Sequence, residues 1–502
     1  MSSLGAARLP PASAFRALDP RRLNYFLQAL AACLLIAGIF AQDAIAYLCV
    51  TIPVLLPAFL WMSFGAYGIP VLPVISALFY LYYAMPLLFG NTLAMYRQED
   101  LIWAALSVGL FLIAASFAAW PFLGVPRAKT APLQRSQSLR YAREIKRKSL
   151  SNLAANEELT RLIFIGFGLG IVFYLSVISG KIGDLGAFAS VIRACVLPLT
   201  SVACYFTGFA RGAGALTGQR WVAALGGFIA VTILSLSSLF LVGGATNIAA
   251  ALLGYALAAN RIPWPTIGVL FAVLVVLNSG KATTRFAYWE RDSQMVRGSS
   301  ITQLPAMMLD WFEAGITNLE SPKATTGPGL FERTSLLHMV LAVQEATPAV
   351  VPYLDGATYA YLPKMLTPRF LQPDKIESQA VLNLLSVRYG RERAEDTYKT
   401  TIGWGMVAEA YANYGNFAVL IVGAVFGVFC GMLMRLSATA SPLSLSMLIT
   451  IAATLNLCNV ESDFSYLTVT LFQTTVGIFV FAAMPRLVRR RRPPVVPYAP
   501  RS

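Results

Sequence analysis

About twelve stretches of roughly 20 mostly apolar residues recur along this chain, and no other feature restricts its fold as strongly. A helix needs about 20 apolar residues to cross the hydrocarbon core of a bilayer, where no water satisfies exposed backbone groups. Composition agrees, because 57% of the residues are hydrophobic and only 13% are charged. The pattern predicts an all-helical, polytopic membrane protein.

The predicted spans lie on both sides of one long polar segment. Those before it are Asn24–Ala41, Ala44–Ser63, Ile69–Phe89, Leu101–Leu123, Arg161–Ser179, Ala189–Phe209, Trp221–Leu241, Thr246–Ala259 and Thr266–Asn278. Those after it are Gly415–Met434, Pro442–Cys458 and Ser465–Met484. The stretches that begin at Thr246 and Thr266 are short, so we expect them to be tilted or partly re-entrant.

The positions of Lys and Arg residues predict the orientation, because cytoplasmic loops accumulate positive charge. These residues gather in the N-terminal arm (residues 1–23), in the connector of residues 125–160 and in the C-terminal tail (residues 486–502). All three regions fall on one side if the spans alternate. We therefore predict cytoplasmic termini, membrane regions over residues 24–278 and 403–485, and a large extracytoplasmic domain over Ser279–Ile402.

Charge and cysteine placement exclude two kinds of function. The segment Ser279–Ile402 has thirteen Lys or Arg and thirteen Asp or Glu, so the net charge of +15 resides outside it. The basic character therefore reports topology and contact with anionic lipids, and we expect no nucleic-acid binding. All six cysteines lie in predicted spans and the chain has a single histidine, which makes a disulfide framework in the outer domain and a metal site equally unexpected.

The outer segment is too long and too rich in aromatic residues to be a passive linker. Apolar residues recur at helical spacing over Ile301–Ile316 and Phe331–Ala346. We expect a folded cap whose helices lie across the bilayer surface. The alternative is a cap with a purely structural role.

Several cations near the outer ends of the spans are candidate phosphate ligands. An arginine inside a span is costly unless it pairs or lines a water-filled cavity, which makes Arg193 a candidate. Planar guanidinium groups bind phosphate oxygens bidentately, as a lipid-linked pyrophosphate would require. Alternatively, the loop arginines form simple ion pairs with adjacent carboxylates. The candidates are Arg193, Lys281, Arg285, Arg291, Arg333 and Arg369.

The stretch Gly403–Gly415, GWGMVAEAYANYG, leads from the outer segment into the next span. Glu409 is expected at the membrane edge, with Tyr411 and Asn413 close by. A carboxylate in a partly apolar mouth gains the basicity that a general base for a sugar hydroxyl requires. The alternative is an interfacial aromatic belt with a solvated glutamate.

Two motifs have a recognisable spacing. Pro352–Lys375 (PYLDGATYAYLPKMLTPRFLQPDK) contains G-x-T-Y followed by P-R and P-x-K, and Glu409–Gly415 reads E-x-Y-x-N-x-G. Together they resemble the Wzy-like O-antigen and exopolysaccharide repeat-unit polymerases, although Ile376 stands where that family often has proline. Ser179–Ala194 is also similar to the family's Gly-containing turn and the following helix, which here bears Arg193. The matching motif positions are Gly356, Thr358, Tyr359, Pro368, Arg369, Pro373, Lys375, Glu409, Tyr411, Asn413 and Gly415.

The resemblance implies a GT-C type glycosyltransferase of the bacterial inner membrane that acts on undecaprenyl-pyrophosphate-linked oligosaccharides at the periplasmic face. A hydroxyl of one lipid-linked repeat would attack the anomeric carbon of the growing chain and expel undecaprenyl pyrophosphate, without cofactor or metal. Arginines would stabilise the leaving group, and Glu409, with His338 as second choice, would accept the proton. Tyr359, Lys375 and Tyr411 would join Asn413 in binding substrate. A chain-length regulator and a flippase are the implied protein partners.

Three alternatives remain from the sequence. An O-antigen ligase differs in its acceptor and not in its membrane topology. A transporter would show repeated halves and charged or broken helices near the midplane, which the sequence does not display. A non-catalytic assembly subunit would tolerate loss of the candidate residues. For an enzyme, we expect one pocket that opens to the outer leaflet and is lined by Arg193, Arg285, Arg291, Arg333, Arg369 and Glu409.

Overall fold

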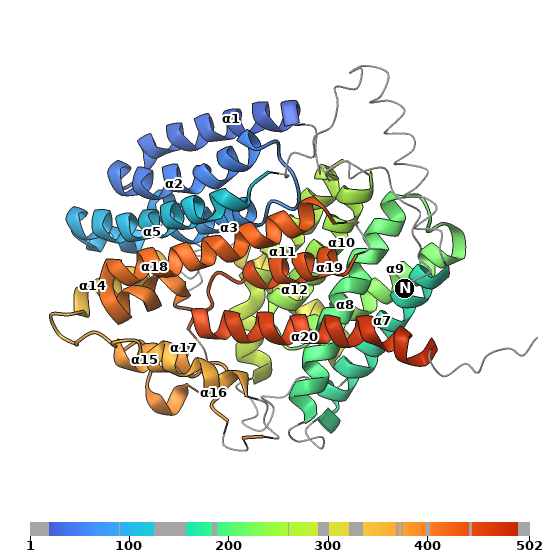
Figure 1. Ribbon diagram of the computed structural model, residues 1–502. Coiled ribbons are helices and arrows are strands. Elements are labelled where there is room, and N and C mark those ends of the chain that lie inside the picture. The colour runs from blue at the N-terminus through green and yellow to red at the C-terminus, as the bar shows by residue number, and fades with distance from the viewer. Residues whose placement is uncertain are drawn as a thin grey trace, which may run out of the picture.

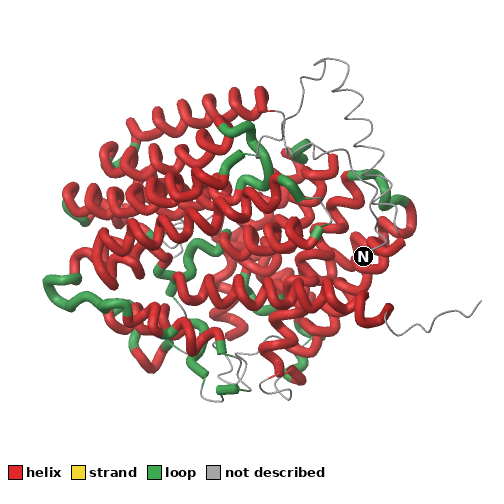
Figure 2. The backbone as a smooth tube through the Cα atoms, viewed as in Figure 1, coloured by secondary structure: helices red, strands yellow, loops and turns green. Residues whose placement is uncertain are grey.

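A computed structural model of the chain describes residues 20–89, 91–124, 157–182, 188–259, 261–289, 301–320, 335–367, 371–372, 375–397, 402–440 and 444–489. This part of the chain is helical and has no β-strand (Figure 2). Its longer helices are α1 (Pro20–Ala37), α2 (Ala44–Ser63), α3 (Val71–Phe79), α5 (Gln98–Ala119), α7 (Glu157–Ile178), α8 (Phe188–Gly212), α9 (Gly218–Leu236), α10 (Leu241–Ala259), α11 (Trp264–Trp289), α12 (Leu304–Glu320), α14 (Leu337–Ala346), α17 (Ala380–Arg388), α18 (Gly405–Ala438), α19 (Leu445–Leu457) and α20 (Phe464–Arg489).

Ten of the described helical segments are long and apolar enough to cross a membrane. Leu445–Leu457 and Phe464–Phe479 are two further apolar helices of shorter length. Large apolar side chains such as Phe117 and Val172 are exposed on the outside of the helices, where a soluble protein would place polar groups. The protein is therefore a multi-pass helical membrane protein.

Helices α1, α2, α3, α5 and α18 lie side by side in one bundle (Figure 1). The closest pair is α5 and α18, and glycines make this approach possible. Gly423, Gly427 and Gly431 are spaced four residues apart on α18 and face the backbone of α5. A methyl group at Gly423 or Gly427 would collide with that backbone, and one at Gly431 would be a tight fit. Such small-residue stripes allow tight helix packing in a membrane, where dispersion replaces the hydrophobic effect as the driving force.

Helices α7, α8, α9 and α10 form a second group, against which α19 and α20 pack. Helix α20 packs against α8, and α19 contacts both α8 and α20. Because α18, α19 and α20 are consecutive, the last part of the chain joins the two groups.

The outer segment was expected to begin at Ser279, but the structure continues α11 as a helix to Trp289. Helix α12 then runs back along α11, with the Trp311 indole donating to the carbonyl of Leu277 at 2.6 Å. Gly280 and Gly315 let the two backbones meet. The helix therefore extends past the apolar stretch because α12 packs against its charged end.

The cap helices take different places. Helix α12 exposes a stripe of apolar side chains, Leu309, Phe312, Ile316 and Leu319. Helix α14 differs, because Leu337, Val340 and Leu341 are buried and the helix packs against α5 and α18. One face of α14 therefore forms part of the protein interior. The short helices α15 (Ala357–Ala360) and α16 (Leu362–Leu366) contact α20.

Candidate active site

The two motif segments meet at Asn413, which is fully buried on α18. Its side-chain amide donates to the hydroxyl of Thr358 at 2.9 Å and to the carbonyl of Glu409 at 2.8 Å. Its side-chain oxygen accepts from the backbone N–H of Gly356 at 3.0 Å. Gly356 and Asp355 both have positive φ, so this amide holds a tight turn against the helix. Residues more than 50 positions apart in the sequence are thereby fixed in one place.

Glu409 lies one helical turn before Asn413 and is also fully buried. Its Oε2 atom accepts from the backbone N–H of Phe464, the first residue of α20, at 2.7 Å. The N-terminal end of a helix carries partial positive charge and favours a carboxyl acceptor, so this bond ties the start of α20 to α18. Glu409 also interacts electrostatically with Asp463, so the site contains two buried carboxyl groups.

Asp463 precedes α20 and its Oδ1 atom accepts from the backbone N–H of Tyr466 at 2.7 Å, as an N-cap residue does. Burial raises the pKa of the Asp463 carboxyl, because a charge is poorly solvated away from water. Tyr359 packs edge-on against the Phe464 ring, with 5.8 Å between centroids. Burial and then the nearby carboxylates raise the pKa of the Tyr359 phenol, so it remains protonated.

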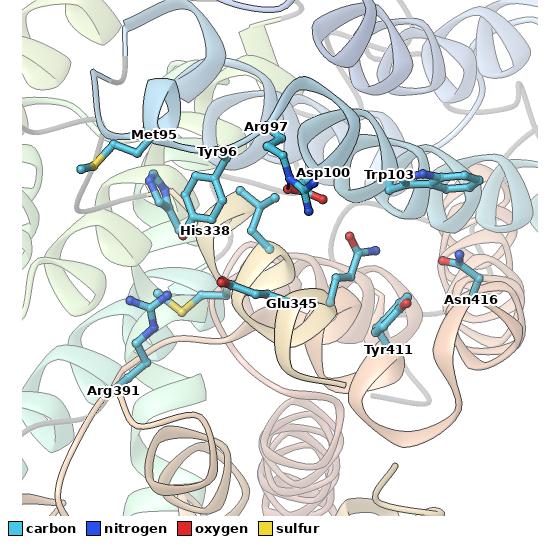
Figure 3. Close-up of a pocket in the computed structure, with 13 residues that line it drawn as sticks. Met95, Tyr96, Arg97, Asp100, Trp103, His338, Glu345, Arg391, Tyr411 and Asn416 are labelled. Atoms are coloured by element: carbon cyan, nitrogen blue, oxygen red, sulfur yellow. Dashed lines mark ion pairs between the residues drawn. The ribbon is translucent and has the colours of Figure 1, made fainter. Parts of the chain in front are cut away.

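A cleft of about 980 Å³ lies on the other side of α18, between α5, α14 and the chain that follows α17 (Figure 3). Tyr411 lines it, although its neighbours Glu409 and Asn413 do not. Glu409 and Asn413 are four residues apart and share the face of α18 with the buried carboxyl pair, whereas Tyr411 lies on the face toward the cleft. Other lining residues are Tyr96, Arg97 and Trp103 at the start of α5, His338 and Gln344 on α14, Arg391, and Asn416 on α18.

The cleft combines cationic, aromatic and uncharged polar groups with two acidic side chains, Asp100 and Glu345. Arg97 forms an exposed ion pair with Asp100 at 3.5 Å, and Arg391 reaches the cleft from an exposed turn. His338 lies against the Tyr96 ring, with 6.1 Å between the ring centroids. Guanidinium groups can hold phosphate oxygens, and an imidazole can accept a proton. The cleft thus has the groups that a polar, phosphate-bearing substrate would need.

The structure brings only part of the predicted site together. Tyr411 and His338 line the cleft, whereas Glu409, Asn413 and Tyr359 lie behind it. The expected position of Glu409 at an open mouth is therefore wrong, because the turn at Gly356 and the start of α20 cover it.

The expected cations do not join the cleft within the described part of the chain. Arg193 is exposed on α8, and Lys281 and Arg285 are half-buried on α11. The Arg285 guanidinium donates to the carbonyl of Leu239 at 3.0 Å and lies 4.5 Å from the Phe240 ring centroid. These three cations do not line the cleft because α8 and α11 lie outside the bundle that contains α5 and α18.

Of four further residues predicted for the site, the structure describes one. Lys375 is half-buried in the segment before α17 and does not line the cleft. Arg291, Arg333 and Arg369 lie outside the described residues. The single pocket expected from the sequence is thus replaced, as far as these residues are described, by a cleft built from other cations.

Sequence reasoning missed Arg97, Trp103, Gln344, Arg391 and Asn416. One signal was present, because Arg97 and Trp103 fall at the outer end of a predicted span, where substrate-binding residues of an outward-facing site are expected. The other three carry no local pattern. The chain matches no known family model, no curated protein and no solved structure.

Proposed function

We propose that the protein is a membrane glycosyltransferase that joins oligosaccharide repeat units carried on undecaprenyl pyrophosphate, at the outer face of the membrane. One observation carries the proposal. The two motifs that resemble the repeat-unit polymerases are separate in sequence, yet Asn413 hydrogen-bonds the first motif from within the second. Tyr411 of the same motif lines the cleft beside it. If the match to the two short motifs were due to chance, there would be no reason for the two segments to contact each other in the structure.

The location of the cleft supports the same function. Helices α5, α18 and α20 begin at the end of the bundle where α14, α15 and α16 pack. In the orientation predicted from the positive charges, this end faces the periplasm. A lipid-linked substrate would keep its prenyl chain in the bilayer while its head group enters the cleft.

The residues of the cleft support the following chemical step. The oxygen of an acceptor hydroxyl attacks the anomeric carbon of the donor sugar, and the bond from that carbon to the pyrophosphate oxygen breaks. His338 accepts the hydroxyl proton, because it is the cleft residue whose neutral form is a good base near neutral pH. Arg97 and Arg391 stabilise the charge on the departing pyrophosphate. Glu409 acts as a positioning residue that joins α18 to α20.

An O-antigen ligase is the second candidate. The observation that favours it is His338 in the cleft, because the ligases resemble the polymerases and are thought to use an outer-face histidine. The two enzymes differ in acceptor, which is a second lipid-linked repeat for the polymerase and a lipopolysaccharide core for the ligase.

Analysis of surface polysaccharide in a deletion strain tests the proposal. We expect single repeat units in place of long chains, and restoration by the wild-type gene but not by His338→Gln. Long polymer that accumulates on its lipid carrier would identify a ligase instead. An unchanged distribution of polysaccharide lengths would refute both. A topology reporter near Asp355 gives an independent check, because a cytoplasmic signal there would exclude a periplasmic reaction.

A further inference from the structure

One end of the cleft is built around the hydroxyl of Ser107, which is fully buried on α5. The hydroxyl of Ser107 accepts from the side-chain amide of Gln344 at 2.8 Å, and its one proton lies between the side-chain oxygen of Asn416 at 2.6 Å, the shorter contact, and the backbone carbonyl of Trp103 at 3.2 Å. Ser107, Asn416 and Gln344 come from α5, α18 and α14. A single buried hydroxyl therefore fixes the orientation of two amide groups from two other helices.

This arrangement determines which amide atoms remain for a ligand. Ser107 uses the nitrogen of Gln344 and the oxygen of Asn416, so the Gln344 oxygen and the Asn416 nitrogen make no further hydrogen bond within the described part of the chain. Both residues line the cleft. The cleft thus presents one acceptor from α14 and one donor from α18, which two hydroxyls of a sugar, or an acetamido group, would complete.

Aromatic side chains stand at the same end. Figure 3 places Trp103 and Tyr411 near Asn416, and His338 and Arg391 at the opposite end. Trp103 is 60% exposed, which is a high exposed fraction for a residue with an indole side chain. The face of an aromatic ring carries negative charge density and attracts the weakly positive C–H bonds on the apolar side of a pyranose. The end with Trp103 is therefore suited to an uncharged sugar ring.

The backbone of α18 is also broken at this point. Tyr414 and Gly415 leave the helical conformation, and Gly415 has φ 62° and ψ −152°, which only glycine adopts readily. Asn416 is the next residue. In membrane proteins, non-helical backbone is tolerated where it is buried in protein or lines a cavity. The break changes the direction of α18 immediately before Asn416, whose side chain lines the cleft.

We propose that Trp103, Gln344, Asn416 and Tyr411 form a subsite for a neutral saccharide ring, with Ser107 as the buried group that orients the two amides. The subsite rests on the proposed function for its class of substrate and adds the place where a sugar of the repeat unit binds. The opposite end, with Arg391 and His338, takes the pyrophosphate and the reacting atoms.

The test uses the full-length protein in nanodiscs and two probes. The first is a panel of methyl glycosides of neutral hexoses and N-acetylhexosamines, and the second is farnesyl pyrophosphate, each titrated by ligand-observed NMR. We expect at least one glycoside to bind the wild type and to bind about tenfold more weakly to Asn416→Ala and Gln344→Ala, as loss of a hydrogen bond predicts. The affinity for farnesyl pyrophosphate should stay at the wild-type value in both variants.

Trp103→Ala provides a variant whose folding is not at issue, because the indole is exposed and no core packing is lost. It should also weaken glycoside binding. Asn318→Ala on α12 removes an amide away from the cleft and serves as the matched control. If no glycoside of the panel binds the wild type, or if all three cleft variants titrate as the wild type does, the subsite is refuted.

The two proposals fail in different ways. Glycoside binding that depends on Asn416 and Trp103, in a protein whose deletion leaves polysaccharide length unchanged, would keep the subsite and refute the polymerase. Loss of polymer in the deletion strain, with glycoside titrations unaffected by the variants, would keep the polymerase and refute the subsite.

Discussion

The side-chain amide of Asn413 donates to the hydroxyl of Thr358 at 2.9 Å and joins the membrane helix to the cap. Both side chains are fully buried, so no water replaces a lost partner. Thr358→Val keeps the shape and removes the acceptor, and we expect the free energy of unfolding to fall by about 1–3 kcal/mol. Thermal unfolding in detergent measures this. Thr397→Val, at a hydroxyl that bonds only within its own turn, is the control and should change little. Equal effects of the two substitutions would contradict the assigned role.

The backbone of α18 at Gly415 also depends on the identity of a single residue. Its backbone has φ 62° and ψ −152°, and an added Cβ would lie 3.1 Å from the Tyr353 hydroxyl. Gly415→Ala should therefore destabilise the protein by about 1–3 kcal/mol. Gly226→Ala on α9 is the matched control, because a Cβ there meets nothing within 4 Å. That change should be neutral or stabilise by about 0.5–1 kcal/mol. Comparable unfolding temperatures for both variants would show that the break in α18 is not strained.

The buried carboxyl of Asp463 predicts a pH dependence of stability. Burial raises the pKa of Asp463 in the folded protein, whereas the unfolded chain has the ordinary value of about 3.9. At a pH between the ordinary pKa and the raised pKa of Asp463, the folded state binds more protons than the unfolded state. The free energy of unfolding therefore falls as the pH rises through this range. Asp463→Asn retains the acceptor for the Tyr466 N–H but cannot ionise, and should flatten this slope.

Unfolding temperatures from about pH 4 to about pH 7 check the prediction for Asp463. Glu320→Gln, at an exposed carboxylate at the end of α12, is the control and should keep the slope of the wild type. A slope that Asp463→Asn leaves unchanged would mean that another group causes it.

The apolar segments predicted the helices well because bilayer thickness limits their length. The expected span Ala44–Ser63 has the same bounds as α2. The ninth span was placed too short, since Lys281 and Arg285 end the apolar run while the helix continues to Trp289 under the packing of α12. Hydropathy detects the part of a helix that lipid surrounds, and not the part that another helix covers.

The candidate site was predictable only where its residues form a local pattern. The stretch around Glu409 and Asn413 was found because its members follow one another on one helix. The cleft was not, since Trp103, Gln344 and Asn416 meet through a hydroxyl on a third helix, and a single sequence carries no record of such remote contacts. Burial of Glu409 was missed for the same reason, because the residues that cover it come from two other segments.

Arg391 lines the cleft, whereas Arg393 pairs with Glu395 at 3.6 Å and lies outside it. Substitution of each arginine by glutamine therefore compares a proposed phosphate ligand with an arginine of the same turn. Loss of a charge-assisted hydrogen bond should weaken binding of farnesyl pyrophosphate by about ten- to hundredfold in Arg391→Gln. Arg393→Gln should bind as the wild type does, because an exposed ion pair contributes little. Equal losses in the two variants would indicate a general effect of surface charge.

The sequence suggests both His338 and Glu409 as acceptors of the hydroxyl proton. Their positions in the structure predict opposite effects when each is replaced by glutamine. His338 lines the cleft, and Glu409 is 0% exposed with one oxygen bound to the Phe464 N–H. We expect His338→Gln to reduce the initial rate of polymer formation by about 10²- to 10⁴-fold, the usual contribution of a general base. Glu409→Gln keeps the acceptor for Phe464 and should retain most of the activity.

The measurement is polymer formation by purified protein supplied with lipid-linked repeat units, with unfolding temperatures recorded for each variant. A base that must be neutral makes the wild-type rate fall at acid pH, and His338→Gln should lose this limb of the profile while keeping the KM for the donor. If Glu409→Gln abolishes polymer at an unchanged unfolding temperature while His338→Gln does not, Glu409 is the base. In that event α20 must move away from α18 for substrate to reach the carboxylate, because the contact with Phe464 covers it in the present arrangement.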